Sequence, residues 1–213
     1  MPQSAVKLPI LTNLHTITEH DHRKTNTALE KAFEKDPIWS RILEEFPDKY
    51  PFIFGVPLKY ALRYGKAYAP TSNIEGAAIW IGSPFIDMNI FRLIRSRSLG
   101  VGLKIGLNLG LKIMKAFEIA EKDRRTFMKG QSYVYLLTLG IHPDFQRQGH
   151  GFNLVKSMLD ALPNEIPVYL ETGTEGNVKF YEKLGFEVIN EITEPIFDST
   201  FWELMYKKQF NQQ

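Results

Sequence analysis

The chain has 213 residues, of which 44% are hydrophobic and 23% are charged, with a formal net charge of +2 and no cysteine. This length fits one domain with a sizeable core, so we expect a single domain over residues 1–213. The nearly balanced charge argues against a dedicated nucleic-acid-binding protein. The lack of cysteine excludes disulfides, thiolate catalysis and cysteine-bound metals, and it is compatible with the reducing cytoplasm, where we expect the protein to act.

The N-terminal segment Met1–Leu14 lacks the basic start and the long apolar core of a signal peptide, so none is expected. The longest apolar segment, Leu99–Phe117, is interrupted by three lysines and an asparagine. It is therefore too polar for a membrane-spanning helix, and no integral membrane association is expected.

The first third of the chain predicts short helices followed by a strand. Thr18 and Asp21 form a capping pair at the start of the first helix, and Gly65 is a stop signal for the last one. The predicted helices cover residues 26–33, 38–46 and 59–64, and a strand over 73–81 ends at Gly82-Ser83-Pro84.

Residues 85–129 form a long, basic segment with a helical pattern. Three glycines recur every four residues and are predicted to share one helix face, while three lysines and one asparagine share another. These residues are Gly102, Gly106 and Gly110, and Lys104, Asn108, Lys112 and Lys115. Glycine inside a helix costs about 1 kcal/mol relative to alanine, so the three indicate close packing against another element or a ligand. The segment is a lid over a substrate pocket, a membrane-surface helix or an insertion with a solvated lysine face.

The last third alternates regularly between strands and helices. Strands are predicted over 133–141, 167–171, 186–192 and 201–206, and helices over 151–162 and 177–184, the latter closed by Gly185. This order indicates an α/β layer architecture of the α+β type.

The stretch 139–151 reads L-G-I-H-P-D-F-Q-R-Q-G-H-G and leads from a strand through a loop into a helix. Free N–H groups and the positive end of the dipole make a helix start an anion site, and glycines let a pyrophosphate approach the backbone. A dinucleotide-binding fold requires G-x-G-x-x-G after the first strand, and a P-loop requires a terminal G-K-S/T; neither is present. A plain structural turn remains an alternative.

A second segment makes the interpretation more specific. The pairing of L-G-I-x-P-x-x-Q-x-x-G-x-G with N-x-x-F-Y-x-x-L-G-F, which starts at Asn177, resembles the GNAT superfamily of acetyl-CoA-dependent N-acetyltransferases. The resemblance covers Tyr133–Val188, about a quarter of the chain. The strand entering L-G-I-x-P, together with Tyr169-Leu170-Glu171-Thr172, is most similar to puromycin acetyltransferase-like members. It implies the GNAT acyl-CoA N-acyltransferase fold, with a mixed central sheet and a helical insertion at about 85–129, between the third and fourth strands.

The resemblance also implies how acetyl-CoA would bind. The backbone of the fourth strand pairs with the pantetheine arm, one N–H polarises the thioester carbonyl, and the following loop holds the pyrophosphate. The strand is splayed from the next one, which opens a wedge for the cofactor. The residues with cofactor-binding roles are Leu139, Gly140, Ile141, Gln146, Arg147, Gln148, Gly149, His150, Gly151 and Asn177. No metal is implied.

Two residues receive catalytic roles. The resemblance makes Tyr181 the acid that protonates the departing thiolate; otherwise it is a core aromatic residue. The strand before the loop holds no carboxylate, so Glu171 is the first candidate for the general base, with Glu75 as the second. The histidines beside the loop, His142 and His150, are given no catalytic role.

The implied reaction is transfer of an acetyl group from acetyl-CoA to a primary amine, within a ternary complex and without a covalent enzyme intermediate. The acceptor is expected to be a small molecule, in part apolar or aromatic if N-terminal aromatic residues line its pocket. The alternatives are a non-catalytic acyl-CoA-binding module and a protein lysine or N-terminal acetyltransferase. The oligomeric state is open, with a homodimer as one alternative.

Overall fold

The computed structural model describes residues 5–208; Met1–Ser4 of the segment considered as a signal peptide lie outside it, as do residues 209–213. The described chain forms a seven-stranded sheet in the order β1-β2-β3-β4-β5-β7-β6. Only β4 and β5 run parallel. The strands are β1 (His15–Thr16), β2 (Gly65–Ala69), β3 (Gly76–Gly82), β4 (Val134–Ile141), β5 (Val168–Thr172), β6 (Glu187–Glu194) and β7 (Ser199–Tyr206).

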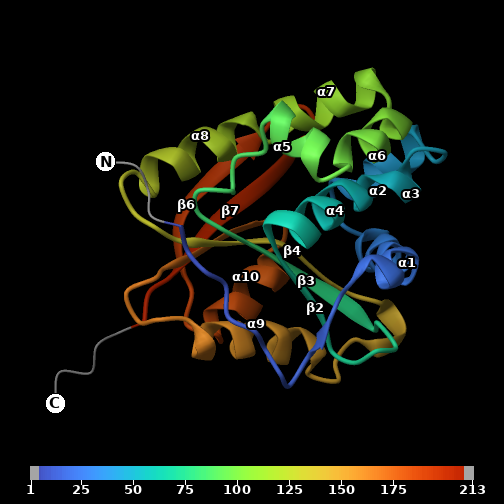
Figure 1. Cartoon of the computed structure of the whole chain (residues 1–213). Helices are drawn as coiled ribbons and strands as arrows, with labels where there is room; N and C mark the ends of the chain where they lie inside the picture. The colour runs from blue at the N-terminus through green and yellow to red at the C-terminus, as the bar shows by residue number, and fades with distance from the viewer. Residues whose placement is uncertain (1–4, 209–213) are drawn as a thin grey trace, which may run out of the picture.

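Helices cover both faces of the sheet (Figure 1). One face carries α9 (His150–Ala161) and α10 (Glu175–Glu182), and the other carries α1 and the helices of the insertion. The remaining helices are α1 (His22–Phe33), α2 (Trp39–Glu45), α3 (Tyr50–Ile53), α4 (Gly55–Tyr64), α5 (Ile90–Arg95), α6 (Ser98–Ile105), α7 (Leu107–Ala116) and α8 (Glu118–Phe127). The predicted mixed α/β fold with a helical insertion between the third and fourth strands is confirmed.

The N-terminal helices follow the predicted signals. The Asp21 carboxylate accepts hydrogen bonds from the backbone N–H and the hydroxyl of Thr18, so the capping pair is real. Gly65 ends α4, but it also begins β2, which the sequence analysis missed. The strand lies directly after the helix, so no loop signal separates the two elements.

The prediction that three glycines share one helix face is wrong. Gly106 has φ +84° and ψ 156°, which is not a helical conformation, so it separates α6 from α7. Other residues adopt this conformation only under strain. A Cβ built on Gly102, Gly106 or Gly110 would meet no described heavy atom within 4 Å. The three glycines therefore make no close contact with another element in this structure. Gly106 divides the insertion into two helices, and the other two lie inside helices with open space around them.

The lysine face of the insertion is only partly solvated. Lys112 forms an ion pair with Glu45 and lies over the rings of Phe46 and Phe197. Lys104 lies over Phe52, with 5.1 Å from its Nζ to the ring centroid. These contacts attach α6 and α7 to the N-terminal helices and to the β6–β7 hairpin.

No helix within residues 5–208 is both long enough and apolar enough to cross a membrane.

Candidate active site

The candidate site begins where β4 and β5 separate. The two strands pair only at Val134 with Val168 and at Tyr135 with Tyr169. Beyond these pairs, β4 runs on to Ile141 and β5 to Thr172, and no further ladder pair joins them in the described chain. The sheet therefore opens into the wedge that the sequence analysis expected.

A β-bulge accounts for part of this divergence. In the pairing of β3 with β4, Ile79 is opposite Thr138 and Trp80 is opposite Leu136, so Leu137 is an extra residue in β4. A bulge bends its strand and increases the local twist. It lies next to the point at which β4 leaves β5, which explains why the strands part there.

The loop after β4 has the shape of an anion site. Arg147 and Gly149 adopt left-handed conformations, with φ +60° and +80°, and Gly149 caps the start of α9. Residues 143–149 are exposed. The first N–H groups of α9 have no partner within the helix and face this loop, which is what a pyrophosphate requires.

The predicted cofactor residues in the loop differ in how they contribute. The Gln146 side chain donates a hydrogen bond to the carbonyl of Ile141 (3.0 Å), and that of Gln148 donates to the carbonyl of Asp144 (3.3 Å). Both side chains thus help to fix the conformation of the loop. His150 is the first residue of α9 and lies near Glu75, whose pKa it helps to lower.

Gly140 matters for the packing of α1 on β4. A Cβ there would lie 2.9 Å from side-chain atoms of Leu29, Ala32 and Phe33. The glycine therefore lets α1 approach β4 on the face opposite α9. Leu139 and Ile141 point to the α9 side, where they pack against the buried core that includes Leu154 and Val155 of α9.

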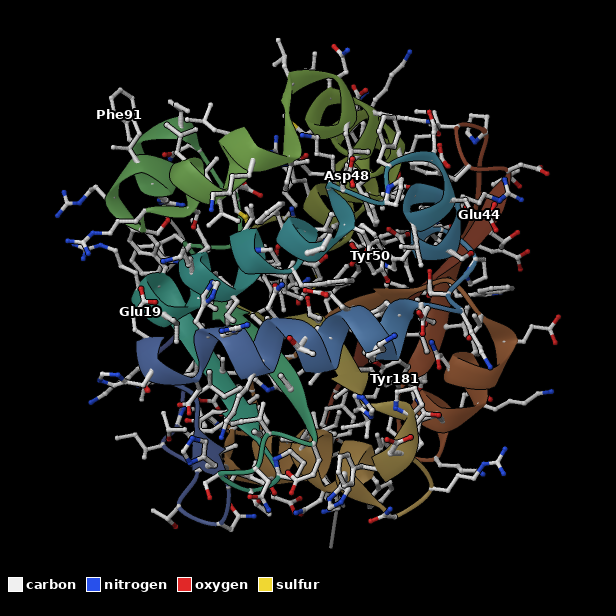
Figure 2. The ribbon with its side chains drawn as sticks, turned by 90° about the vertical axis from the view of Figure 1, so that its right-hand side faces the viewer. Glu19, Glu44, Asp48, Tyr50, Phe91 and Tyr181 are labelled. Atoms are coloured by element: carbon white, nitrogen blue, oxygen red, sulfur yellow. The ribbon has the colours of Figure 1, made fainter. Side chains whose placement is uncertain are left out.

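Asn177 and Tyr181 come from α10, whose N-terminus is capped by the Thr174 hydroxyl. Asn177 donates a hydrogen bond from its side chain to Thr172 Oγ1 at the end of β5 (2.9 Å). Tyr181 is 7% exposed, its ring lies against Phe186, and burial raises the pKa of its hydroxyl. Figure 2 shows Tyr181 inside the molecule. A phenol with a raised pKa keeps its proton at neutral pH, so Tyr181 is in the protonated form that a general acid requires.

Glu171 occupies the other face of the sheet near the end of β5. It accepts a hydrogen bond from the Tyr135 hydroxyl at 2.5 Å, and both side chains remain partly exposed. Burial raises the pKa of Glu171 to about 7, although the Tyr135 hydrogen bond and the charge of Arg124 oppose the shift. A carboxyl group with this pKa can exchange a proton near neutral pH.

The surroundings of Glu171 form a connected polar network. Arg124 of α8 is 5% exposed; it donates a hydrogen bond to the Tyr133 hydroxyl (2.7 Å) and pairs with Asp87 (3.0 Å). Its guanidinium also lies over the ring of Tyr135, 5.3 Å from the centroid. The insertion therefore contributes a positive charge directly beside the candidate base.

Glu203 extends this network across the sheet. It is the cross-strand neighbour of Glu171 on β7, and its carboxylate accepts hydrogen bonds from Tyr169 (2.5 Å) and Asn190 (2.8 Å). Burial raises the pKa of Glu203 as well. Both carboxylates lie in a region where burial favours the neutral form.

Glu75, the second candidate base, is engaged elsewhere. Its carboxylate accepts hydrogen bonds from the N–H and the hydroxyl of Thr71 and closes the turn between β2 and β3. Burial raises its pKa, but these hydrogen bonds outweigh that effect and leave the pKa lowered. This geometry favours a structural role.

Comparison with known proteins supports the fold and shows a family match for part of the chain. A family model described as the acetyltransferase (GNAT) family matches residues 116–186. Residues 116–186, which contain β4, α9, β5 and α10, are therefore similar to the GNAT family. GNAT proteins use acetyl-CoA, so the chain is an acetyl-CoA-dependent acetyltransferase, and the divergent β4 and β5 with the loop before α9 fit this substrate.

Three solved structures share this GNAT fold. A histone acetyltransferase HPA2 and related acetyltransferase from Corynebacterium glutamicum is 17% identical, with a TM-score of 0.64 over 94% of this chain and 98% of that one. Arylalkylamine N-acetyltransferase 2 from Aedes aegypti is 14% identical, with a TM-score of 0.57 over 92% and 98%. An N-acetyltransferase from Staphylococcus aureus is 15% identical, with a TM-score of 0.54 over 90% and 98%. At these identities the likeness concerns the fold.

The sequence analysis missed most of the network around Glu171. Arg124 lies in the insertion, where nothing marks it among the other basic residues. Tyr135 and Tyr169 offered a weak signal, because each lies two residues from another polar side chain on an otherwise apolar strand and so shares a face with it. Of the aromatic residues considered for an acceptor pocket, Trp39 and Phe54 pack on each other in the core.

Proposed function

We propose that the protein transfers the acetyl group of acetyl-CoA to the primary amine of a small molecule, by direct attack within a ternary complex. Glu171 is the general base and Tyr181 the general acid. Acetyl-CoA is held by the backbone of Leu139–Ile141, by the loop 146–151 and by Asn177. The finer resemblance to puromycin acetyltransferase-like members, the cytoplasmic location and a homodimer stay predictions.

The observation that carries this proposal is the environment of Glu171. Its carboxyl group has a pKa of about 7 and a short hydrogen bond to Tyr135, beside the opening between β4 and β5. An amine must lose a proton to attack a thioester, and a base that is half ionised near pH 7 suits this task. Glu171 lies on β5, one of the two splayed strands, and acts on the amine directly or through one water molecule.

The chemical steps follow from these positions. Glu171 takes a proton from the ammonium form, and the nitrogen lone pair attacks the thioester carbonyl carbon. The Leu139 N–H stabilises the oxyanion of the tetrahedral intermediate. The C–S bond then breaks, and the thiolate takes the proton of the Tyr181 hydroxyl. The remaining extra proton on the amide nitrogen returns to the Tyr181 phenolate, so the proton on Glu171 is the one released to solvent. Much of the rate arises from holding both substrates together.

A small acceptor is favoured by the position of the insertion. Helix α8 lies along β6 and β7 (Figure 1), and its Arg124 reaches the Tyr135 ring beside Glu171. Asp123 of the same helix accepts a hydrogen bond from Asn190 of β6 (3.1 Å). The face that bears Glu171 is therefore partly covered by α8, whereas a protein substrate requires an open groove.

The test is the pH dependence of acetyl transfer in the Glu171→Gln variant. Thiol release from acetyl-CoA is measured against a panel of arylalkylamines, polyamines, amino sugars and a lysine peptide. The wild type is expected to lose kcat/KM below a pH of about 7 with the best small amine. Glu171→Gln should lower kcat/KM by about a hundredfold or more and remove this acidic limb.

Glu203→Gln is the matched control, because Glu203 is a buried carboxylate on the adjacent strand. It should keep an acidic limb that moves to lower pH, because the charge of Glu203 helps to raise the pKa of Glu171. If Glu203→Gln removes the limb and Glu171→Gln does not, Glu203 is the base. Preference for the lysine peptide over every small amine would overturn the proposed small-molecule acceptor. Reaction with small polar amines alone would overturn the expectation that the acceptor is partly apolar or aromatic.

A further inference from the structure

The helical insertion exposes an unusual number of large apolar side chains. Seven of them are 51–75% exposed, and we refer to them together as the insertion face. They are Ile90, Phe91 and Ile94 of α5, Leu103 of α6, and Leu107, Leu111 and Met114 of α7. Figure 2 shows Phe91 at the edge of the molecule, pointing away from it. Exposed apolar surface on this scale marks an interaction site.

The pattern on α7 shows that this exposure is systematic. Leu107, Leu111 and Met114 have the spacing i, i+4, i+7 and lie on one side of the helix. Leu109 and Ala116 are buried on the opposite side, against the rest of the protein. An ordinary surface helix is mainly polar on its outer side, whereas the outer side of α7 carries three large apolar side chains beside Asn108 and Lys115.

The same segment carries a one-sided charge. Residues 90–117 contain six arginines and lysines and no acidic residue, although the whole chain has a net charge of only +2. The remainder of the chain is therefore net negative. Arg95, Arg97, Lys104 and Lys115 are exposed and lie between or beside the apolar side chains.

This positive charge distinguishes between two possible partners of the insertion face, a second copy of the chain and an anionic membrane. In a symmetric dimer through the insertion face, the four exposed basic residues of one copy would meet the same four of the other, which is unfavourable. An anionic bilayer offers negative headgroups to the basic residues and acyl chains to the leucines. Lysine and arginine can extend to the headgroups while apolar neighbours insert.

We propose that the insertion face docks the enzyme peripherally on an anionic membrane surface, with α5 to α7 lying in the plane of the interface. The proposal does not depend on which amine is acetylated, nor on the roles of Glu171 and Tyr181. None of the side chains in the insertion face belongs to the candidate active site. Docking and catalysis can therefore be separated by mutation.

Vesicle sedimentation tests the proposal. The wild type is mixed with vesicles of phosphatidylcholine alone or of phosphatidylcholine with phosphatidylserine, and the bound fraction is measured at low and high salt. We expect binding to the anionic vesicles only, weakened by salt. The triple variant Leu107→Gln, Leu111→Gln, Met114→Gln should lose about tenfold or more in vesicle affinity. Arg95→Gln and Lys115→Gln should each lose about fivefold.

Matched controls lie elsewhere on the surface. Ile10 is 72% exposed, like Met114 at 71%, and Lys24 is an exposed base on α1. Ile10→Gln and Lys24→Gln should bind vesicles as the wild type does, and acetyl-CoA turnover of all variants should be unchanged without vesicles. Equal binding to both kinds of vesicle, no binding to either, or equal losses in the control variants would each overturn the proposal. Loss of a wild-type dimer in the triple variant, without vesicle binding, would instead assign the face to a second copy.

Discussion

The proposed donor and acceptor sides of the candidate site are built in opposite ways. The donor side consists of β4, the loop 142–151 and the start of α10, and it presents mainly backbone N–H groups and glycines. The acceptor side consists of β5, β7 and the insertion, and it presents charged and phenolic side chains such as Glu171 and Arg124. A backbone site needs a particular loop conformation, which leaves a glycine pattern in the sequence. A side-chain network needs residues brought together from distant segments.

The difference also bears on how each side can change. A loop that holds a pyrophosphate through N–H groups tolerates many side chains, provided that its left-handed positions are kept. On the acceptor side, each buried group shifts the pKa of the others, so one substitution alters several neighbours. The donor side should therefore respond to backbone changes and the acceptor side to loss of single hydroxyl groups or charges.

The largest effect is expected for Tyr181→Phe, where the two sides meet. Loss of the hydroxyl removes the proposed proton donor for the thiolate, so kcat should fall by about a hundredfold or more with little change in acetyl-CoA affinity. Steady-state kinetics and calorimetric titration measure the two quantities. Tyr206→Phe is the control, because Tyr206 also lies against Phe186 but on β7. Equal losses of turnover and affinity would make Tyr181 a cofactor contact.

Gly149 is the sharpest test of the backbone character of the donor side. Its φ of +80° disfavours a β-branched residue, so Gly149→Val should relax the loop and weaken acetyl-CoA binding by about tenfold. Gly151→Ala should have a smaller effect, because its Cβ would lie an ordinary 3.5 Å from Ile141. Titration with acetyl-CoA measures both. Equal affinities for Gly149→Val and the wild type would refute a rigid anion loop.

Tyr135→Phe tests the acceptor side with a smaller expected change. The Tyr135 hydrogen bond lowers the pKa of Glu171 by stabilising its ionised form, so its loss should raise this pKa above about 7. The acidic limb of kcat/KM should then move to higher pH by about one unit. Tyr133→Phe is the control, because Tyr133 contacts Arg124 and forms no described hydrogen bond with Glu171. An unmoved limb in Tyr135→Phe would separate Glu171 from the titration that limits the rate.

The sequence predicted the parts of this molecule that depend on local signals. The capping pair at Thr18, the stop at Gly65 and the strand–loop–helix around Gly149 are all recognisable within a few residues, and each is present. The wedge between β4 and β5 was expected from a resemblance, and no local signal marked the bulge at Leu137 that accompanies it.

The sequence could not predict what depends on distant contacts. Arg124 reaches Tyr135 only because α8 folds back over the sheet, and nothing near Arg124 in the sequence marks that contact. The same holds for the pKa of Glu171, which burial sets. The glycine spacing in the insertion gave a wrong prediction for a related reason. A four-residue repeat does not show whether one helix continues through all of its glycines.

The smallest predicted effect concerns the stability of the protein when these glycines are replaced. We expect substitutions at Gly102 and Gly106 to change it in opposite directions. Gly102 lies inside α6 with open space around it, so Gly102→Ala should stabilise the protein by about 0.5–1 kcal/mol. Gly106 has φ +84° and ψ 156°, so Gly106→Ala should destabilise it by about 1–3 kcal/mol. Thermal unfolding should show Tm shifts of opposite sign, about 2–4 °C per kcal/mol. Destabilisation by both substitutions would restore the interpretation in which the glycines pack closely along one continuous helix.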